Sequence, residues 1–231
     1  MKVDIGIIGA MQPEVEALID ALSGKAIESV SGIDFYTGKI GDKSVAIAKC
    51  GIGKVFAAIC AEVMILKYSP DLLVNTGVGG ALAAGLTTGD IVIADTLCQH
   101  DMDTSPIGDP KGLVSGINMI YFDADKRAGE ILLASAKELG LNARLGRIAT
   151  GDKFIASSDD KDRIIADFSA DACEMEGCAI AQTAFVNGTP FAVVRAISDS
   201  ADGEATMDYP TFLGIASKNS TAMTLSLIKA W

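Results

Sequence analysis

Acidic residues that follow strand-like segments could carry acid/base chemistry in this sequence. Asp199 comes at the end of the apolar run 190–197, which is typical of a buried strand. Glu14 follows a second strand-like run, residues 3–10. Ligands of open α/β sheets bind beyond the carboxyl ends of the strands. Carboxylates that converge there from separate strands would suit proton transfer to and from a small polar molecule.

A further pair of acids, Glu174 and Glu176, flanks Met175 in a short segment that is predicted to be extended. Alternation along a strand would direct both glutamates to one face and Met175 to the other. The helix-like run that follows is almost entirely apolar, so we expect at least one acid to be buried and to hold a hydroxyl or a proton. A structural ion pair with Arg195 is the alternative.

Strand-like and helix-like segments alternate along the chain and would bring these acids together. Strands are predicted at residues 3–10, 33–39, 44–49, 71–76, 91–100, 143–150, 171–175 and 190–197. Helices are predicted at about 15–22, 55–66, 124–139, 177–186 and 209–229, with a short polar helix after 155 and a long loop at 100–120. We therefore predict one α/β domain over residues 1–231, a three-layer αβα sandwich with a central mixed, mostly parallel sheet.

Two glycine-rich segments need separate interpretation. The segment GIGKV at 51–55 lacks the further glycine and the Ser/Thr of a phosphate-binding P-loop, so its glycines are interpreted as close packing of a helix on a strand end. Residues 77–80, GVGG, are predicted to form a turn where a flat ligand ring could approach the backbone. A plain tight turn is the alternative.

The composition argues against several classes of partner. Lys and Arg number 19 against 30 Asp and Glu, and the net charge of −11 disfavours nucleic acid and anionic membranes. The five cysteines form no CxxC pair and are predicted to be reduced core thiols. His100 is the only histidine, which rules out a two-histidine metal site, and we expect neither metal nor cofactor. With no apolar run of roughly 18 residues and no signal-peptide pattern, a cytoplasmic protein is expected.

Seven motifs, in this order and spacing, resemble those of the 5′-methylthioadenosine/S-adenosylhomocysteine nucleosidases within the purine nucleoside phosphorylase superfamily. They are GIIGAMQPEV at 6–15, GIGKV at 51–55, NTG at 75–77, GDIV at 89–92, GDKFI at 151–155, EME at 174–176 and RAISD at 195–199. The resemblance covers essentially the whole chain. It implies hydrolysis of the N-glycosidic bond of a 5′-substituted adenosine to adenine and the 5′-substituted ribose.

The resemblance also implies roles for individual residues. Asp199 would be the general acid at N7 of adenine, supported by Ser198, and Glu14 the base that activates water. Glu176 would hold the ribose 2′- and 3′-hydroxyls, with Met175 beneath the sugar. The other implied substrate contacts are Phe154 stacked on adenine, the Ile155 backbone at its edge, Tyr209 near the 5′-substituent, Arg195 beside the water, and Met11, Ile52, Val78 and Gly79.

A phosphate-dependent phosphorylase and a non-catalytic nucleoside-binding protein are the alternatives. Phosphorylases of this superfamily hold phosphate with arginines and a serine, whereas this chain has Gln12-Pro13-Glu14, Asn75 and Val78 at those places. An anion would meet Glu14 at a Coulomb cost of several kcal/mol, so water is the favoured nucleophile.

Two features of the resemblance leave points open. Val78 replaces the serine that most nucleosidases carry near the water and ribose, which leaves the geometry of the water site open. The family implies a homodimer in which the loop from Thr104 to Leu113 lies near the partner's active site. That loop departs from the better-known members, so the preferred 5′-substituent stays open between methylthio, homocysteinyl, 5′-deoxy and futalosine-type nucleosides.

Overall fold

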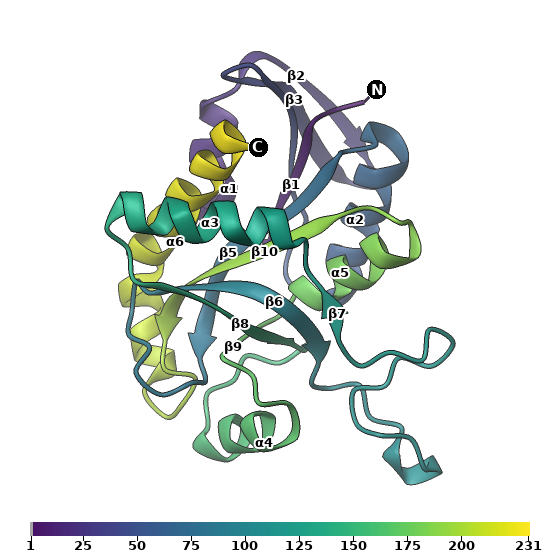
Figure 1. Cartoon of the computed structure of the whole chain (residues 1–231), viewed down its shortest axis with the longest axis vertical. Helices are drawn as coiled ribbons and strands as arrows, with labels where there is room; N and C mark the ends of the chain where they lie inside the picture. The colour runs from purple at the N-terminus through teal and green to yellow at the C-terminus, as the bar shows by residue number, and fades with distance from the viewer. Residues whose placement is uncertain (1) are drawn as a thin grey trace.

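A mixed β-sheet is the centre of the computed structural model, which describes residues 2–231 (Figure 1). Its ten strands within that range are β1 (Ile5–Gly9), β2 (Ser23–Val30), β3 (Ile33–Ile40), β4 (Lys43–Lys49), β5 (Leu72–Ala81), β6 (Ile91–Gln99), β7 (Phe122–Asp123), β8 (Ala143–Thr150), β9 (Ala172–Glu174) and β10 (Phe191–Asp199). The helices are α1 (Gln12–Asp20), α2 (Lys54–Tyr68), α3 (Lys126–Leu139), α4 (Ser158–Phe168), α5 (Gly177–Val186) and α6 (Ala205–Ala230), with a 3₁₀ turn, η1 (Ser105–Ile107).

The strands follow the order β10-β6-β8-β9-β5-β1-β4-β3-β2, with β7 beside β6. Because β10 also pairs with β5, the strands β5, β10, β6, β8 and β9 form a closed ring of pairings. Register shifts in β6, between Ala94 and Thr96, and in β10, between Ile197 and Asp199, accompany this closure. Irregularities of this kind bend a strand and increase its twist.

The expected mixed sheet is confirmed; parallel and antiparallel strand pairings are equal in number, and the parallel pairings join more residues. Parallel pairings join β1 to β4 and β5, β10 to β5, and β8 to β6 and β9. Antiparallel pairings are equally numerous among the described residues: β2, β3 and β4 form a meander, and β10 and β7 pair antiparallel to β6, as β9 does to β5. Only the β3–β4 hairpin of this meander was visible in the sequence pattern.

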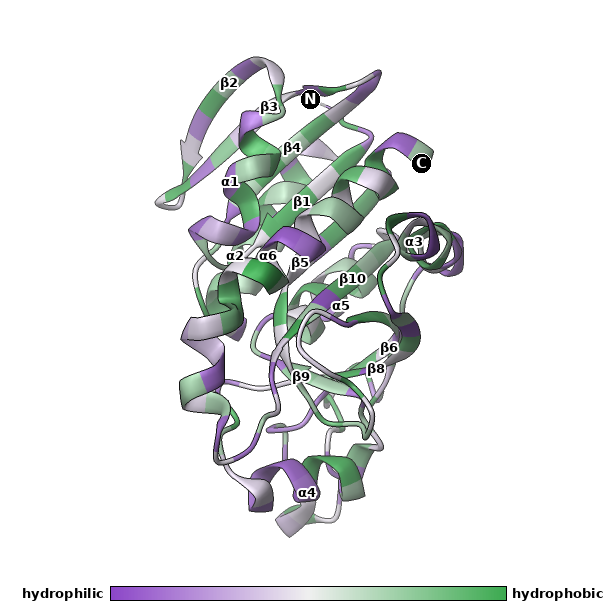
Figure 2. Ribbon diagram, turned by 90° about the vertical axis from the view of Figure 1, so that its left-hand side faces the viewer, coloured by the Kyte–Doolittle hydropathy of each residue, from purple (hydrophilic) through white to green (hydrophobic). Residues whose placement is uncertain are grey.

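Hydrophobic side chains pack in two large clusters on either side of the central strands. Side chains of α2 and α5 contribute to one cluster, and side chains of α1, α3 and α6 to the other. In β1, Ile8 belongs to the first cluster and Ile7 to the second, since successive strand residues point to opposite faces. Figure 2 shows the central strands coloured hydrophobic along most of their length. The central strands are therefore covered by helices on both faces of the sheet.

Three local predictions differ from the structure. Residues 23–30 form the edge strand β2, which the pattern did not indicate because nearly every side chain in it is exposed. Helix α6 begins at Ala205 rather than near 209 and contains Pro210. Residues 77–80 are not a turn but the last part of β5. The five cysteines are free and buried, as expected, and no helix within residues 2–231 is long and apolar enough to cross a membrane.

Candidate active site

A cavity of about 500 Å³ opens at the edge of the sheet where β5, β9 and β10 end and α1 and α6 begin. Most of the residues that the sequence singled out lie on its wall. These are Met11, Glu14, Ile52, Val78, Gly79, Phe154, Ile155, Met175, Glu176, Ser198, Asp199 and Tyr209. Of the predicted site residues, Arg195 is the one that does not line the cavity.

Glu14 is buried at the start of α1, with 3% of its surface exposed. Its Oε2 accepts hydrogen bonds from the backbone N–H groups of Ala10 at 2.8 Å and Met11 at 2.9 Å, and its Oε1 accepts one from Val78 at 3.1 Å. These donors fix the carboxylate at the N-terminal end of the helix, where a negative charge is favoured. Burial raises the pKa of Glu14 above its ordinary value, although Arg195 and the three N–H groups act against it. A raised pKa suits a general base that works near neutral pH.

Asp199 is the last residue of β10 and is 3% exposed. The register shift between Ile197 and Asp199 re-aims the strand end at this point. Its Oδ2 accepts a hydrogen bond from the Ser198 hydroxyl at 2.7 Å, and its Oδ1 accepts one from the Ala201 N–H at 3.0 Å. Burial raises the pKa of Asp199 in spite of both hydrogen bonds. The side chain can therefore hold a proton at a higher pH than an exposed aspartate.

The segment 174–176 does not stay extended, so the predicted alternation is wrong. Strand β9 ends at Glu174, and Glu176 already has the conformation that precedes helix α5. As a result Glu174, Met175 and Glu176 all reach the cavity wall. Burial and the neighbouring Glu174 raise the pKa of Glu176 to about 8.

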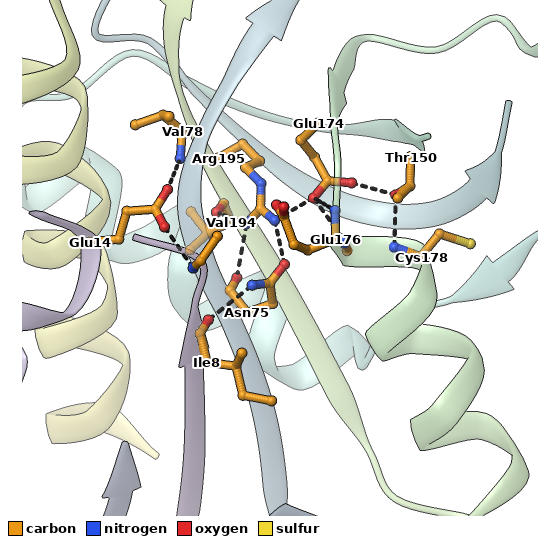
Figure 3. Close-up of polar contacts among 12 residues, drawn as sticks. Ile8, Glu14, Asn75, Val78, Thr150, Glu174, Glu176, Cys178, Val194 and Arg195 are labelled. Atoms are coloured by element: carbon orange, nitrogen blue, oxygen red, sulfur yellow. Dashed lines mark hydrogen bonds and ion pairs between the residues drawn. The ribbon is translucent and has the colours of Figure 1, made fainter. Parts of the chain in front are cut away.

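Glu174, on the cavity wall, forms a buried ion pair with Arg195 behind it (Figure 3). Arg195 Nη2 is 2.5 Å from Glu174 Oε2, and it also donates to the side chain of Asn75. Glu174 accepts further hydrogen bonds from the N–H groups of Glu176 at 2.9 Å and of the next residue at 2.6 Å. The alternative that the sequence left open, a structural glutamate–arginine pair, is present with Glu174. In Figure 3 Arg195 lies between Glu174 and the carboxylate of Glu14.

Residues 77–80 leave room for the site's own carboxylates rather than forming a turn. They continue β5, paired with β10, and Gly80 also pairs with Cys173 of β9. A Cβ on Gly77 would lie 2.5 Å from Glu14 Oε1, and one on Gly80 would lie 3.0 Å from Asp199 Oδ1. A side chain at Gly77 would displace Glu14, and one at Gly80 would press on both Ala201 and Asp199.

Two aromatic side chains, Phe154 and Tyr209, form part of the cavity wall. The rings of Phe154 and Tyr209 meet edge to face with their centroids 5.5 Å apart, and Phe154 keeps 42% of its surface exposed. The Tyr209 hydroxyl is 3.1 Å from the sulfur of Met11, and burial raises its pKa to about 12. Ile52 is also exposed at the wall, whereas Ile155 is buried. Flat apolar surfaces of this kind suit an aromatic ring of a ligand.

Several wall residues were missed by the sequence reasoning. They are Ala10, Lys153, Cys173 and Thr206. Cys173 reaches the wall because it pairs with Gly80, and Thr206 because α6 begins at Ala205. Neither feature has a signal in the local sequence pattern. Within residues 2–231 no group of three His, Cys, Asp or Glu side chains is arranged to hold a metal ion.

The α/β fold has a cavity at the strand ends that is lined by buried acids and aromatic rings. These features are typical of enzymes that bind small polar molecules with flat rings. The family model of the phosphorylase superfamily matches residues 4–229, and the chain belongs to this superfamily. Within it, the resemblance to the 5′-methylthioadenosine/S-adenosylhomocysteine nucleosidases is confirmed by the relatives described next.

A 5′-methylthioadenosine/S-adenosylhomocysteine nucleosidase of Haemophilus influenzae is 40% identical over 225 residues, which cover 97% of this chain and 98% of that protein. The crystal structure of the Neisseria meningitidis enzyme of the same name, in complex with methylthio-immucillin-A, has a TM-score of 0.95 and 34% identity over 98% of this chain and 99% of that one. Futalosine hydrolase of Helicobacter pylori has a TM-score of 0.94 and 30% identity, with 98% and 97% covered.

Proposed function

We propose that this protein hydrolyses the N-glycosidic bond of 5′-substituted adenosines and releases adenine and the 5′-substituted ribose. The observation that carries the proposal is the pair of buried carboxyls, Glu14 and Asp199, on the wall of one cavity. Both have raised pKa values, and each has hydrogen-bond donors that fix its position. The 40% identical nucleosidase relatives support the same reaction.

The positions of the two acids suit a displacement at the anomeric carbon. Gly77 and Gly80, which contact Glu14 and Asp199, are separated along β5 by about 10 Å at the usual rise of a strand. They also face opposite sides of that strand, because an odd number of steps separates them. Glycosidases that invert place their acid and base about 6.5–9.5 Å apart so that water fits between base and sugar. We infer that Asp199 is the acid and Glu14 the base, on opposite sides of the sugar.

In the proposed reaction Asp199 gives its proton to N7 of adenine. Protonation makes the purine a better leaving group, and the ribose becomes oxocarbenium-like as the bond breaks. The proton on Asp199 is available near neutral pH because burial raises its pKa, and the Ser198 hydroxyl holds Oδ2 in place. Glu14 takes a proton from the attacking water on the other side of the sugar.

Glu176 is proposed to hold the 2′- and 3′-hydroxyls of the ribose, with Met175 beneath the sugar. A carboxyl whose pKa is about 8 can carry a proton at neutral pH, and it can then donate to one hydroxyl and accept from the other. Phe154 and Ile155 are proposed to contact the face and the edge of adenine. Arg195 is proposed to act on the water site only through its charge, because it lies behind the wall.

Water rather than phosphate is the proposed nucleophile. The part of the cavity next to Val78 offers a carboxylate, Glu14, and the buried Arg195 is already engaged by Glu174 and Asn75. A phosphate dianion placed there would be repelled by Glu14 at a cost of several kcal/mol. A phosphorylase would need a free cation at this place.

The test is an assay of free adenine from a panel of 5′-substituted adenosines, with and without phosphate. Wild type should release adenine without phosphate, and the Asp199→Asn variant should lose at least about 100-fold in kcat while still binding the nucleoside. A requirement for phosphate would support a phosphorylase. Tight binding with no turnover by wild type would support a nucleoside-binding protein. The panel includes a futalosine-type nucleoside, because a futalosine hydrolase is among the structural neighbours.

A homodimer is proposed as the working form, with the loop from Thr104 to Leu113 near the partner's cavity. An apolar surface runs along α2 and the end of α5, beside a hollow of about 420 Å³, and its exposed side chains include Val55, Phe56, Ile59, Leu66, Phe185 and Val186. Surfaces of this extent are uncommon on monomers. The loop projects from the body of the molecule in Figure 1. Sedimentation analysis tests the dimer, and a monomer at micromolar concentration would contradict it.

Two further proposals concern the architecture of the chain. The chain is proposed to be a single nucleoside phosphorylase-like domain over residues 1–231, which is supported by the family model over 4–229. The three-layer αβα arrangement is proposed on the two helix groups that flank the central strands.

A further inference from the structure

Three loops meet beside the cavity and are joined by one carboxylate, that of Asp101. Strands β6 and β8 end side by side, so Asp101 after β6 and Asp152 after β8 are neighbours. Asp101 Oδ2 accepts a hydrogen bond from the Asp152 backbone N–H at 2.9 Å. Its Oδ1 accepts a hydrogen bond from Lys54 Nζ, at the start of α2, at 2.7 Å. The carboxylate therefore links the starts of two loops to the first residue of a helix.

A third hydrogen bond joins Lys54, Asp101 and Asp152 into a closed ring of hydrogen bonds. The backbone N–H of Lys54 donates to Asp152 Oδ1 at 2.8 Å. N–H groups in the first turn of a helix have no acceptor within that helix, and Gly53, the residue at the cap, has no side chain to supply one. Asp152 thus caps α2 from a different loop. Moving any one of the three residues would break bonds to the other two.

The ring holds the two ends of the proposed substrate site. Gly53, next to Lys54, donates its N–H to Glu176 Oε1 at 2.8 Å. This glycine has φ of +100°, and a Cβ on it would lie 3.0 Å from Asp152 Oδ1. On the other side, Asp152 is followed closely by Phe154 on the cavity wall. The hydrogen-bonded ring of Lys54, Asp101 and Asp152 is therefore connected to Glu176 through Gly53 and to Phe154 through the chain after Asp152.

Asp101 and Asp152 lie at the surface, but the Asp101 side chain takes part in more contacts than a single surface ion pair. The side chains of Lys54 and Asp101 are only 20% and 29% exposed. Lys54 Nζ also donates to Oε1 of the buried Gln99 at 3.1 Å. Burial alone would raise the pKa of Asp101, but the Lys54 ammonium and the Asp152 N–H outweigh it and lower the pKa, so the carboxylate stays charged. Charge-assisted hydrogen bonds of fixed geometry are the stronger class.

We propose that Asp101 is a positioning residue that, through Lys54 and Asp152, sets the spacing between the ribose-holding carboxyl of Glu176 and the adenine-facing ring of Phe154. Asp101 touches no substrate in this view. The inference rests on the proposed function, because it assigns ribose to Glu176 and adenine to Phe154. Nothing in the sequence pattern around residue 101 indicated this role.

The experiment measures kcat and KM for adenine release by wild type and by the variants Asp101→Ala, Asp101→Asn and Asp71→Ala. We expect Asp101→Ala to lower kcat/KM by about 10- to 100-fold, mostly through KM, because errors of the order of 1 Å in substrate placement have effects of that size. Asp101→Asn keeps one acceptor oxygen and should lose less. Asp71→Ala removes an ion pair with Lys2, 2.8 Å long, at the opposite ends of the strands and serves as the matched control with wild-type kinetics.

A double-mutant cycle with Glu176→Gln separates positioning from general loss of structure. If Asp101 acts through Glu176, its removal in the Glu176→Gln background should lower kcat/KM by less than about threefold, because coupled residues are not additive. Equal losses in both backgrounds, or wild-type kinetics of Asp101→Ala, would overturn the proposal. If Asp101→Ala does not fold, Asp101→Asn is judged by the same criteria. Failure of the wild type to release adenine would instead contradict the proposed function.

Discussion

Gly77 gives the sharpest test of the site, because its missing side chain leaves the space that Glu14 occupies. A Cβ at this position would lie 2.5 Å from Glu14 Oε1 and 3.0 Å from its carboxyl carbon, where an ordinary contact needs about 3.4 Å. In Gly77→Ala the carboxylate must therefore move by about 0.9 Å. The backbone of Gly77 does not have a positive φ, so alanine itself causes no strain there.

The displacement would weaken all three hydrogen bonds that hold Glu14, at present 2.8, 2.9 and 3.1 Å long. A reacting group that is misplaced by about 1 Å costs about 100-fold in rate, or about 2.7 kcal/mol in the barrier. We therefore expect kcat of Gly77→Ala to fall about 100-fold, with KM changed less than about threefold, since Glu14 is not assigned to substrate binding. Adenine release gives both constants, and calorimetric binding of a non-hydrolysable analogue checks that the cavity is intact.

Two further variants complete the test. Gly129→Ala, in the first turn of α3 with only an ordinary contact of 3.4 Å, should keep wild-type kinetics. Glu14→Asp shortens the side chain by one methylene, so adding Gly77→Ala to it should cost much less than adding Gly77→Ala to wild type. A folded Gly77→Ala protein whose kcat lies within twofold of wild type would refute the assignment of Glu14 as a fixed base.

Three other predictions follow from the same carboxyls. The folded state raises the pKa of Glu176 from 4.5 to about 8, so it binds the proton more tightly than the unfolded chain does. The resulting stability is complete below about pH 4.5 and is lost as the pH rises to about 8. Urea unfolding of wild type should accordingly weaken by up to about 1.4 kcal/mol per pH unit in this range. The Glu176→Gln variant should lack this component, and identical pH profiles would contradict the buried, protonated state. Val78→Ser would place a hydroxyl beside Glu14 and is expected to raise kcat about two- to tenfold, the worth of one hydrogen bond; a lower kcat measured by adenine release would argue against a water molecule there. Glu14→Gln should abolish turnover and leave analogue binding within about threefold, and an active variant would exclude the base role.

The strand ends were the most predictable part of the molecule. Asp199 and Glu14 were found from apolar runs that stop at a polar residue, because the carboxyl ends of neighbouring strands meet at one edge of a sheet. The helices α2, α3 and α5 and the strand β8 likewise follow from local apolar periodicity. Apart from Arg195, the residues that the sequence pointed to line one cavity, and their roles there are proposals.

What the sequence could not supply depends on contacts between distant residues. Residues 77–80 have poor strand propensity, yet they pair with β10 and β9, and this tertiary context outweighs the local preference for a turn. The edge strand β2 lacks alternation because both of its faces are exposed. Asp101, Asp152 and Lys54 come from three separate regions, and only the fold brings them together.

The ring of strands also affects the order in which the protein can become active. Strand β10 pairs Phe191 with Leu73 and Ala196 with Ile91, so it joins two strands that were synthesised more than a hundred residues earlier. Contacts of such long sequence separation form late, and a chain on the ribosome folds from its N-terminal end. Until β10 has emerged, Asp199 is missing and Gly77 has no neighbour on that side. A nascent chain that has not yet reached residue 199 lacks the proposed acid, so catalytic competence can arise only after β10 has been made and has paired with β5 and β6.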